Sequence, residues 1–138
     1  MTWTDRRGSK YGAKSTEFEG VVYHSKKEAG RAAELHLLER AKQITNIRRQ
    51  VKISIDVCVV CSKLVRGACI ECHRRTGFAS TLRHITNYYI DFVYHDVKKD
   101  TEVYEEVKGF SQPIWQLKWA LTEALLGDDE TIELLVTR

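Results

Sequence analysis

Acidic side chains interrupt two short apolar runs in the second half of the chain. Asp91 lies within residues 88–94, and Glu106 lies within residues 102–109 together with Lys108. Because successive residues of a β-strand point to opposite faces, Glu106 and Lys108 share one face of such a strand. If the two runs pair as a hairpin, Asp91 lies beside them. Burying these charges without partners is costly, so a metal ion or a function is needed to explain them.

Two carboxylates and an ammonium group in one place are suited to metal-dependent hydrolysis of a phosphodiester bond. Asp91, Glu106 and the backbone carbonyl of Val107 would hold Mg²⁺ or Mn²⁺, and the metal ion would activate a water. Lys108 would orient that water or stabilise the developing negative charge. Glu28 is a candidate third acid, although a capping-box glutamate needs no other explanation. The ordinary alternatives are a surface Asp91 and an ion pair between Glu106 and Lys108.

Four cysteines form the pattern CxxC-x7-CxxC, namely Cys58, Cys61, Cys69 and Cys72. Two such pairs supply the four thiolates that a structural, tetrahedral Zn²⁺ site requires, with disulfides and a redox CxxC as alternatives. We therefore expect residues 57–77 to be an inserted zinc-binding module. It either contacts phosphate groups through its arginines or clips a long connection between strands.

Hydrophobic periodicity and capping signals place these residues on a small set of elements. We expect a strand over residues 17–24, a helix from Lys26 to about Lys42, a strand over residues 44–56, a helix from Pro113 to Gly127 and a strand over residues 131–136. Ser111 or Gln112 would cap the second helix. Its expected core stripe is Ile114, Leu117, Leu121, Ala124 and Leu125, while Trp115 and Trp119 serve the core, a dimer face or DNA. The expected fold class is α+β with a mixed sheet.

Composition and charge favour a nucleic-acid partner. The chain has 138 residues, is 43% hydrophobic and carries a net charge of +3, which suits one soluble domain. Residues 42–52 hold four basic and no acidic residues, and residues 128–133 are acidic, an asymmetry that suits a polyanion or reflects ordinary surface charge. We expect residues 1–16 to form a basic, flexible arm. No apolar run approaches the roughly 20 residues of a membrane span, so we expect no membrane association and a cytoplasmic location.

These pieces together resemble the PD-(D/E)xK, or restriction-endonuclease-like, nucleases, in particular the small phage and archaeal-type Holliday junction resolvases. The matching segments are residues 10–14, 18–29, 90–94 and 106–113, with Ile90 where the family name has proline. The resemblance implies a mixed central β-sheet flanked by helices. It also implies that Glu28, Asp91, Glu106 and Lys108 form a metal-dependent catalytic set.

The function that the resemblance implies is Mg²⁺-dependent cleavage of branched DNA by a homodimer, without a nucleotide cofactor, in the cytoplasm of a phage-infected bacterium. A chain this short reads DNA by shape and backbone charge, and paired cuts at a four-way junction need two active sites. The expected DNA-contacting residues are Lys10, Lys14, Arg48, Arg49, Arg74, Arg75, Gln116 and Lys118. The alternatives are another DNA repair, recombination or end-processing nuclease of this fold, and a non-catalytic zinc-ribbon DNA-binding or regulatory protein.

Overall fold

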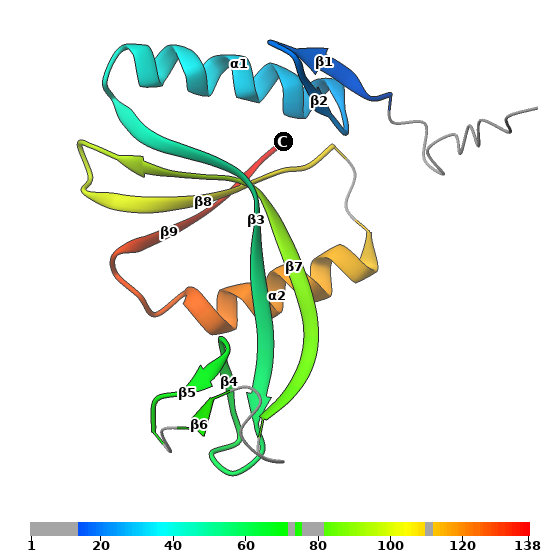
Figure 1. Ribbon diagram of the computed structural model, residues 1–138, viewed down its shortest axis with the longest axis vertical. Coiled ribbons are helices and arrows are strands. Elements are labelled where there is room, and N and C mark those ends of the chain that lie inside the picture. Colours follow the sequence, from blue (N-terminus) through cyan, green and yellow to red (C-terminus); the bar gives the residue numbers. More distant parts are fainter. Residues whose placement is uncertain (1–13, 72–73, 76–81, 110–111) are drawn as a thin grey trace, which may run out of the picture.

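The computed structural model describes residues 14–71, 74–75, 82–109 and 112–138 and has an α+β fold (Figure 1). Its central sheet has the strand order β4 (Lys63–Val65), β3 (Ile44–Cys58), β7 (Leu82–Asp96), β8 (Thr101–Val107) and β9 (Ile132–Thr137). Neighbouring strands of this sheet are antiparallel except β8 and β9, which are parallel. The expected mixed sheet is therefore confirmed.

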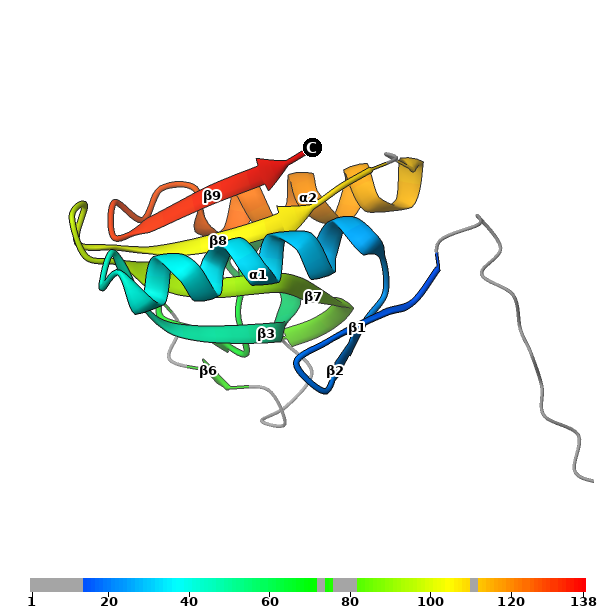
Figure 2. The same ribbon diagram turned by 90° about the horizontal axis from the view of Figure 1, so that it is seen from above.

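Two helices cover opposite faces of this sheet, as Figure 2 shows. Helix α1 (Lys26–Arg40) packs on a cluster that includes Val103 of β8, whereas helix α2 (Pro113–Leu126) packs on a cluster that includes the next residue, Tyr104. Because adjacent strand residues point to opposite faces, the sheet lies between two separate cores. No helix in the described part of the chain has the length and apolar character needed to span a membrane.

Helix α1 begins where its capping signal predicted. The Ser25 hydroxyl accepts a hydrogen bond from the backbone N–H of Glu28 at 3.2 Å, which satisfies one of the free donors at a helix start. Ala29, Ala32 and Leu35 are buried against the sheet. Leu37 of the same helix is 64% exposed and so lies outside the core.

The core stripe predicted for α2 is wrong in part. Ile114 and Leu117 are 69% and 60% exposed, while Trp119 and Leu126 are buried. The helix is rotated toward its tryptophans, since burying an indole ring removes more apolar surface from water than burying an aliphatic side chain. Gln112 is the N-cap and Gly127 the C-cap, as expected, whereas Ser111 lies outside the described residues.

The single strand expected over residues 17–24 is a hairpin instead. Strands β1 (Thr16–Phe18) and β2 (Val21–Tyr23) pair antiparallel across Glu19 and Gly20, which have φ of 50° and 76°. Positive φ at both central residues defines the tight hairpin turn whose twist matches that of its strands. Thr16, at the end of the predicted arm, is thus the first residue of β1.

Strands β3 and β7 are longer than the sequence predicted, and they change their packing partner at one point. Simple alternation would place Tyr88, Ile90, Phe92 and Tyr94 of β7 on one side of the sheet. Instead, Tyr88 and Ile90 belong to the core under α2, whereas Phe92 and Tyr94 belong to the core under α1. Asp91 lies at this change. Figure 1 shows both strands curving from the α1 region toward the end of the sheet at β4.

Candidate metal sites

The β7–β8 hairpin places Asp91 opposite Glu106. The β7–β8 register ends with Phe92 opposite Glu105, and Asp91 and Glu106 are the next residues along the two strands, near enough for their charges to interact. Side chains directly opposite each other share a face, with Cβ atoms about 4.5–5.5 Å apart. The backbone N–H of Val107 also donates to Oδ2 of Asp91 at 2.9 Å. Two acids distant in sequence therefore lie side by side.

Burial and neighbouring charge change the protonation of Asp91. Burial and then the charge of Glu106 raise the pKa of Asp91 to about 7, and the Glu28 carboxylate acts in the same direction. The Val107 N–H and the Lys108 ammonium group oppose this rise. The other two predicted acids and the predicted lysine therefore all act on Asp91 through space. A cation bound between the acids would favour their ionised forms.

Glu106 is buried, and the side chains of Lys108 and Tyr88 interact with its carboxylate. Its side chain is 3% exposed, and the Lys108 ammonium nitrogen lies 3.0 Å from its Oε1. Among the described residues, no donor reaches Oε2, although this atom is buried. A buried charged group with an unsatisfied oxygen is costly, and a bound cation would remove that cost.

Lys108 is held by contacts from two elements. In addition to Glu106, its ammonium group lies 5.4 Å from the centre of the Trp115 ring, within the range of a cation–π contact. The Trp115 indole N–H donates to the Tyr88 hydroxyl at 2.8 Å. Helix α2 thus helps to position the lysine beside the acidic pair.

Glu28 lies at the start of α1, buried, with partners of its own. Its Oε2 accepts from the His24 backbone N–H at 3.1 Å, and its Oε1 lies 3.4 Å from Nη2 of Arg49. The guanidinium of Arg49 in turn stacks over the Tyr23 ring. Half of the predicted capping box is present, because the Ser25 hydroxyl accepts a hydrogen bond from the Glu28 backbone N–H. In the other half, the Glu28 carboxylate accepts from the backbone N–H of His24 and not from that of Ser25. Glu28, Asp91 and Glu106 do not form a group whose ligand oxygens all lie within 4.8 Å of one another.

The neighbouring acid, Glu105, faces the other side of the sheet and is fully satisfied. It is completely buried and accepts hydrogen bonds from Arg31, from the Tyr94 hydroxyl at 2.7 Å and from the Thr137 hydroxyl at 2.6 Å. The Arg31 guanidinium binds both of its oxygens, which is the strong, bidentate form of this ion pair. Glu105 therefore has a structural role that Glu106 lacks.

Sequence reasoning missed Gln50, which binds Asp91 from β3. Its side-chain Nε2 donates to Oδ1 of Asp91 at 3.1 Å, and its backbone has φ of 49° in the middle of a strand. Left-handed backbone is rare for residues other than glycine and often marks functional sites. A glutamine within an alternating run carries no sequence signal of such a role.

The predicted DNA-contacting residues are in different surroundings. Arg48 forms an ion pair with Glu102, and Arg49 is bound to Glu28. The Lys118 ammonium lies 3.4 Å from the backbone oxygen of Asn87. Lys14 and Gln116 are exposed, Arg74 and Arg75 form the short strand β6 (Arg74–Arg75), and Lys10 is outside the described residues.

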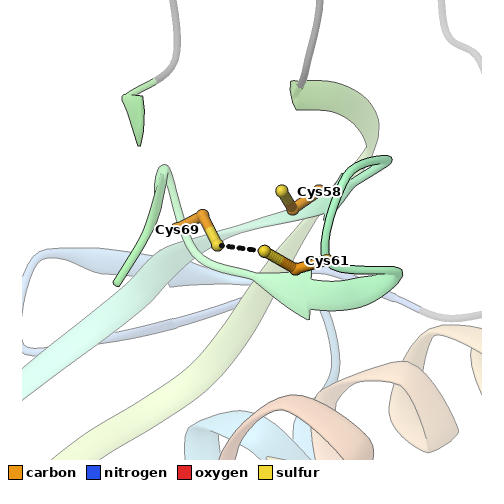
Figure 3. Close-up of side chains that lie close together, drawn as sticks. All are labelled: Cys58, Cys61 and Cys69. Atoms are coloured by element: carbon orange, nitrogen blue, oxygen red, sulfur yellow. Dashed lines mark hydrogen bonds between the residues drawn. The ribbon is translucent and has the colours of Figure 1, made fainter. Parts of the chain in front are cut away.

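Three of the four predicted zinc ligands come together (Figure 3). The sulfur atoms of Cys58, at the end of β3, Cys61, in the following turn, and Cys69, in β5 (Ala68–Cys69), all lie within 4.8 Å of one another. Cys72 lies outside the described residues. Since β3 extends through Cys58, the module overlaps the central sheet at its start, and β5 pairs with β6.

The sulfur spacing suits a metal ion. The Sγ atoms of Cys61 and Cys69 are 3.6 Å apart, far beyond the bond length of about 2.05 Å in a disulfide. A tetrahedral zinc ion with Zn–S bonds of about 2.3 Å has sulfur–sulfur edges of about 3.8 Å. The cysteine cluster can therefore hold a metal ion such as zinc.

Comparison of the chain with protein-family models, with curated proteins and with solved structures finds no match. The fold and the sites define the chain as an α+β protein with a mixed central sheet between two helices and a three-cysteine cluster that can bind metal.

Proposed function

We propose that this protein is a Mg²⁺-dependent endodeoxyribonuclease with a restriction-endonuclease-like fold. The observation that carries the proposal is the pair formed by half-buried Asp91 and buried Glu106, with a raised pKa on the first and an unsatisfied oxygen on the second. Two neighbouring carboxylates that are largely shielded from water, with a lysine beside one of them, are expected where a divalent cation binds. The order of α1, the three antiparallel strands β3, β7 and β8, and then α2 and a parallel β9 supports the fold assignment.

Each residue of the site has a defined role in this proposal. Asp91 and Glu106, with the backbone carbonyl of Val107, would hold Mg²⁺ or Mn²⁺, which when bound polarises a phosphoryl group and lowers the pKa of a water. Lys108 stabilises the negative charge that develops on the phosphate oxygens. Glu28 supplies a third negative charge, since it already acts on the pKa of Asp91.

The proposed substrate is branched DNA, most specifically a four-way junction cut by a homodimer. The basic residues of β3 support recognition through phosphate charge. The cysteine cluster, holding zinc, would fix the far ends of β3 and β4. Repair or end-processing nucleases of the same fold share this chemistry, and the choice of substrate decides between them.

The test is cleavage of a synthetic four-way junction and of a matched linear duplex with Mg²⁺. We expect Asp91→Asn and Lys108→Ala to lower the cleavage rate at least about 100-fold, as loss of a group that stabilises transition-state charge does. Binding of the junction in Ca²⁺ should change little. The matched controls are Asp100→Asn and Lys98→Ala, because both residues are exposed at the β7–β8 turn.

The outcomes separate the candidate functions. Cleavage of both substrates at equal rates would retain the nuclease and reject junction selectivity. Junction binding without any cleavage would favour the non-catalytic, zinc-ribbon DNA-binding protein. Variants at Asp91 and Lys108 that cut like the parent would reject the site.

A further inference from the structure

One face of the β3–β7 ladder leads from Asp91 to the cysteine cluster and is not covered by either helix. Across this ladder Lys52 pairs with Tyr89, Ser54 with Asn87, and Asp56 with His84. The alternate residues, such as Ile53 and Tyr88, face the core under α2. The ladder face is therefore the opposite side of the same two strands, and we call it the Tyr89 face, defined by Lys52, Ser54, Asp56, His84, Asn87 and Tyr89.

Side-chain hydrogen bonds mark both ends of the Tyr89 face. At one end Gln50 binds Asp91, and at the other Nδ1 of His84 lies 2.7 Å from Oδ1 of the fully buried Asp56. Asp56 also accepts from the backbone N–H of Gly67, in the loop between Cys61 and Cys69. At about 3.3 Å per strand residue, the distance from Asp91 to His84 is roughly 23 Å, the length of about seven stacked nucleotides.

The exposed side chains on this face are of the types that proteins use to bind single-stranded nucleic acid, an aromatic ring and a lysine. Tyr89 is 51% exposed, and Lys52 beside it is exposed as well. Asp56 and Asp91 lie at the two ends of this face, and between them residues 44–55 of β3 and 82–90 of β7 include no aspartate or glutamate. An aromatic ring on an open sheet surface stacks on an unpaired base, and a neighbouring lysine neutralises its phosphate. Bases inside a duplex are already stacked and do not reach such a ring.

We propose that the Tyr89 face binds the unpaired nucleotides of a branched or frayed DNA substrate and leads their backbone to Asp91. The inference rests on the proposed nuclease function, because it assigns the DNA strand beside that site. It places Tyr89 as the stacking platform and Lys52 as the phosphate contact. Base stacking is tolerant of sequence, so this face would select for unpaired DNA and not for particular bases.

The experiment measures binding of a labelled single-stranded oligodeoxythymidine in Ca²⁺, without cleavage, by fluorescence anisotropy. We expect Tyr89→Ala to weaken binding roughly 5- to 100-fold and Tyr89→Trp to retain it within about twofold, because stacking needs only an aromatic ring. Lys52→Ala should lower the slope of log affinity against log salt by about 0.7. The control Lys98→Ala removes the same charge from the β7–β8 turn and should bind like the parent, and thermal melting checks the fold of each variant.

The results distinguish this inference from the nuclease proposal. Parent-like binding by both Tyr89→Ala and Lys52→Ala overturns the inference, even if the protein cuts DNA. Equal weakening by Lys98→Ala also overturns it, because general charge would then explain binding. Displacement of the oligonucleotide by polyglutamate as readily as by DNA would assign the face to an acidic protein partner. Weaker binding by Tyr89→Ala in a protein that never cuts DNA with Mg²⁺ or Mn²⁺ would retain the DNA-binding face and reject the nuclease.

Discussion

Gln50 donates a hydrogen bond from its side-chain Nε2 to Oδ1 of Asp91 across 3.1 Å. The other oxygen of Asp91 accepts from the Val107 backbone N–H at 2.9 Å. Both carboxylate oxygens are thus oriented by donors from the two neighbouring strands, β3 and β8. Gln50 does so from a left-handed backbone conformation that costs of order 1–3 kcal/mol, so the rest of the fold must stabilise this conformation.

The left-handed backbone of Gln50 gives the first prediction. Gln50→Gly removes the backbone strain together with a hydrogen bond worth about 1 kcal/mol, so the free energy of unfolding should change by less than about 1 kcal/mol. Gln50→Val, a β-branched residue with φ of 49°, should destabilise the protein by about 1–3 kcal/mol. Urea unfolding of the two variants measures both changes. Equal destabilisation by glycine and valine would show that the side-chain hydrogen bond, and not the backbone, dominates at this position.

The raised pKa of Asp91 predicts a dependence of stability on pH in the absence of metal. In the folded protein this pKa is about 7, above its ordinary value of 3.8, so the folded state keeps a proton that the unfolded chain releases. Stability should therefore decrease as the pH rises from about 4 to about 7. Asp91→Asn has no such proton, so its stability relative to the parent should increase over this range in EDTA.

Urea unfolding of parent and Asp91→Asn at a series of pH values measures this effect. Adding Mg²⁺ should stabilise the parent at pH values near or above 7 and leave Asp91→Asn unchanged, because a divalent cation favours the ionised carboxylate. Parallel pH profiles for the two proteins would be inconsistent with a raised pKa at Asp91.

The sequence was sufficient to predict the elements around the site. The Ser25 cap, the alternation in β8 and the proline at the start of α2 are local signals, and each places an element within a few residues of its position in the structure. The hairpin between β7 and β8 follows from the short connection between them. The local pattern was thus sufficient to predict that Asp91 and Glu106 lie near each other.

The remaining features depend on tertiary structure, which a local pattern does not contain. Ile114 and Trp119 are both apolar at helical spacing, and only the space under α2 determines which of them is buried. The turn at Glu19 and Gly20 lies inside an otherwise strand-like run. The role of Gln50 depends on the register of β3 against β7, which places it opposite a residue 41 positions away. Such long-range relationships leave no periodic signal.

Two adjacent glutamates of β8 should respond in opposite ways to the same substitution. Glu105→Gln removes the buried anion that binds half-buried Arg31 and leaves Arg31 only the exposed Glu34, so we expect a loss of about 1–3 kcal/mol in the free energy of unfolding. Glu106→Gln removes a charge that repels Asp91 and has an unsatisfied oxygen, so stability without metal should change by less than about 1 kcal/mol or increase. Urea unfolding in EDTA compares the two.

Cleavage provides the second measurement on this pair. Well below its melting temperature, Glu105→Gln should still cut DNA, whereas Glu106→Gln should not. A folded Glu106→Gln variant with parent-like cleavage would remove Glu106 from the site, whatever its stability.

The cysteine cluster predicts a metal content that can be measured directly. Purified protein should contain about one zinc ion per chain, and Cys61→Ser or Cys69→Ser should lose it, since each removes a thiolate from a site with short sulfur–sulfur distances. Val59→Ser, an exposed position between Cys58 and Cys61, is the matched control and should keep the metal. Cys72→Ser tests the fourth ligand, because a complete four-thiolate site loses zinc as readily on loss of Cys72 as on loss of Cys69. Retention of zinc by Cys72→Ser would instead give a three-cysteine site completed by another group, and elemental analysis after dialysis against a mild chelator distinguishes the two.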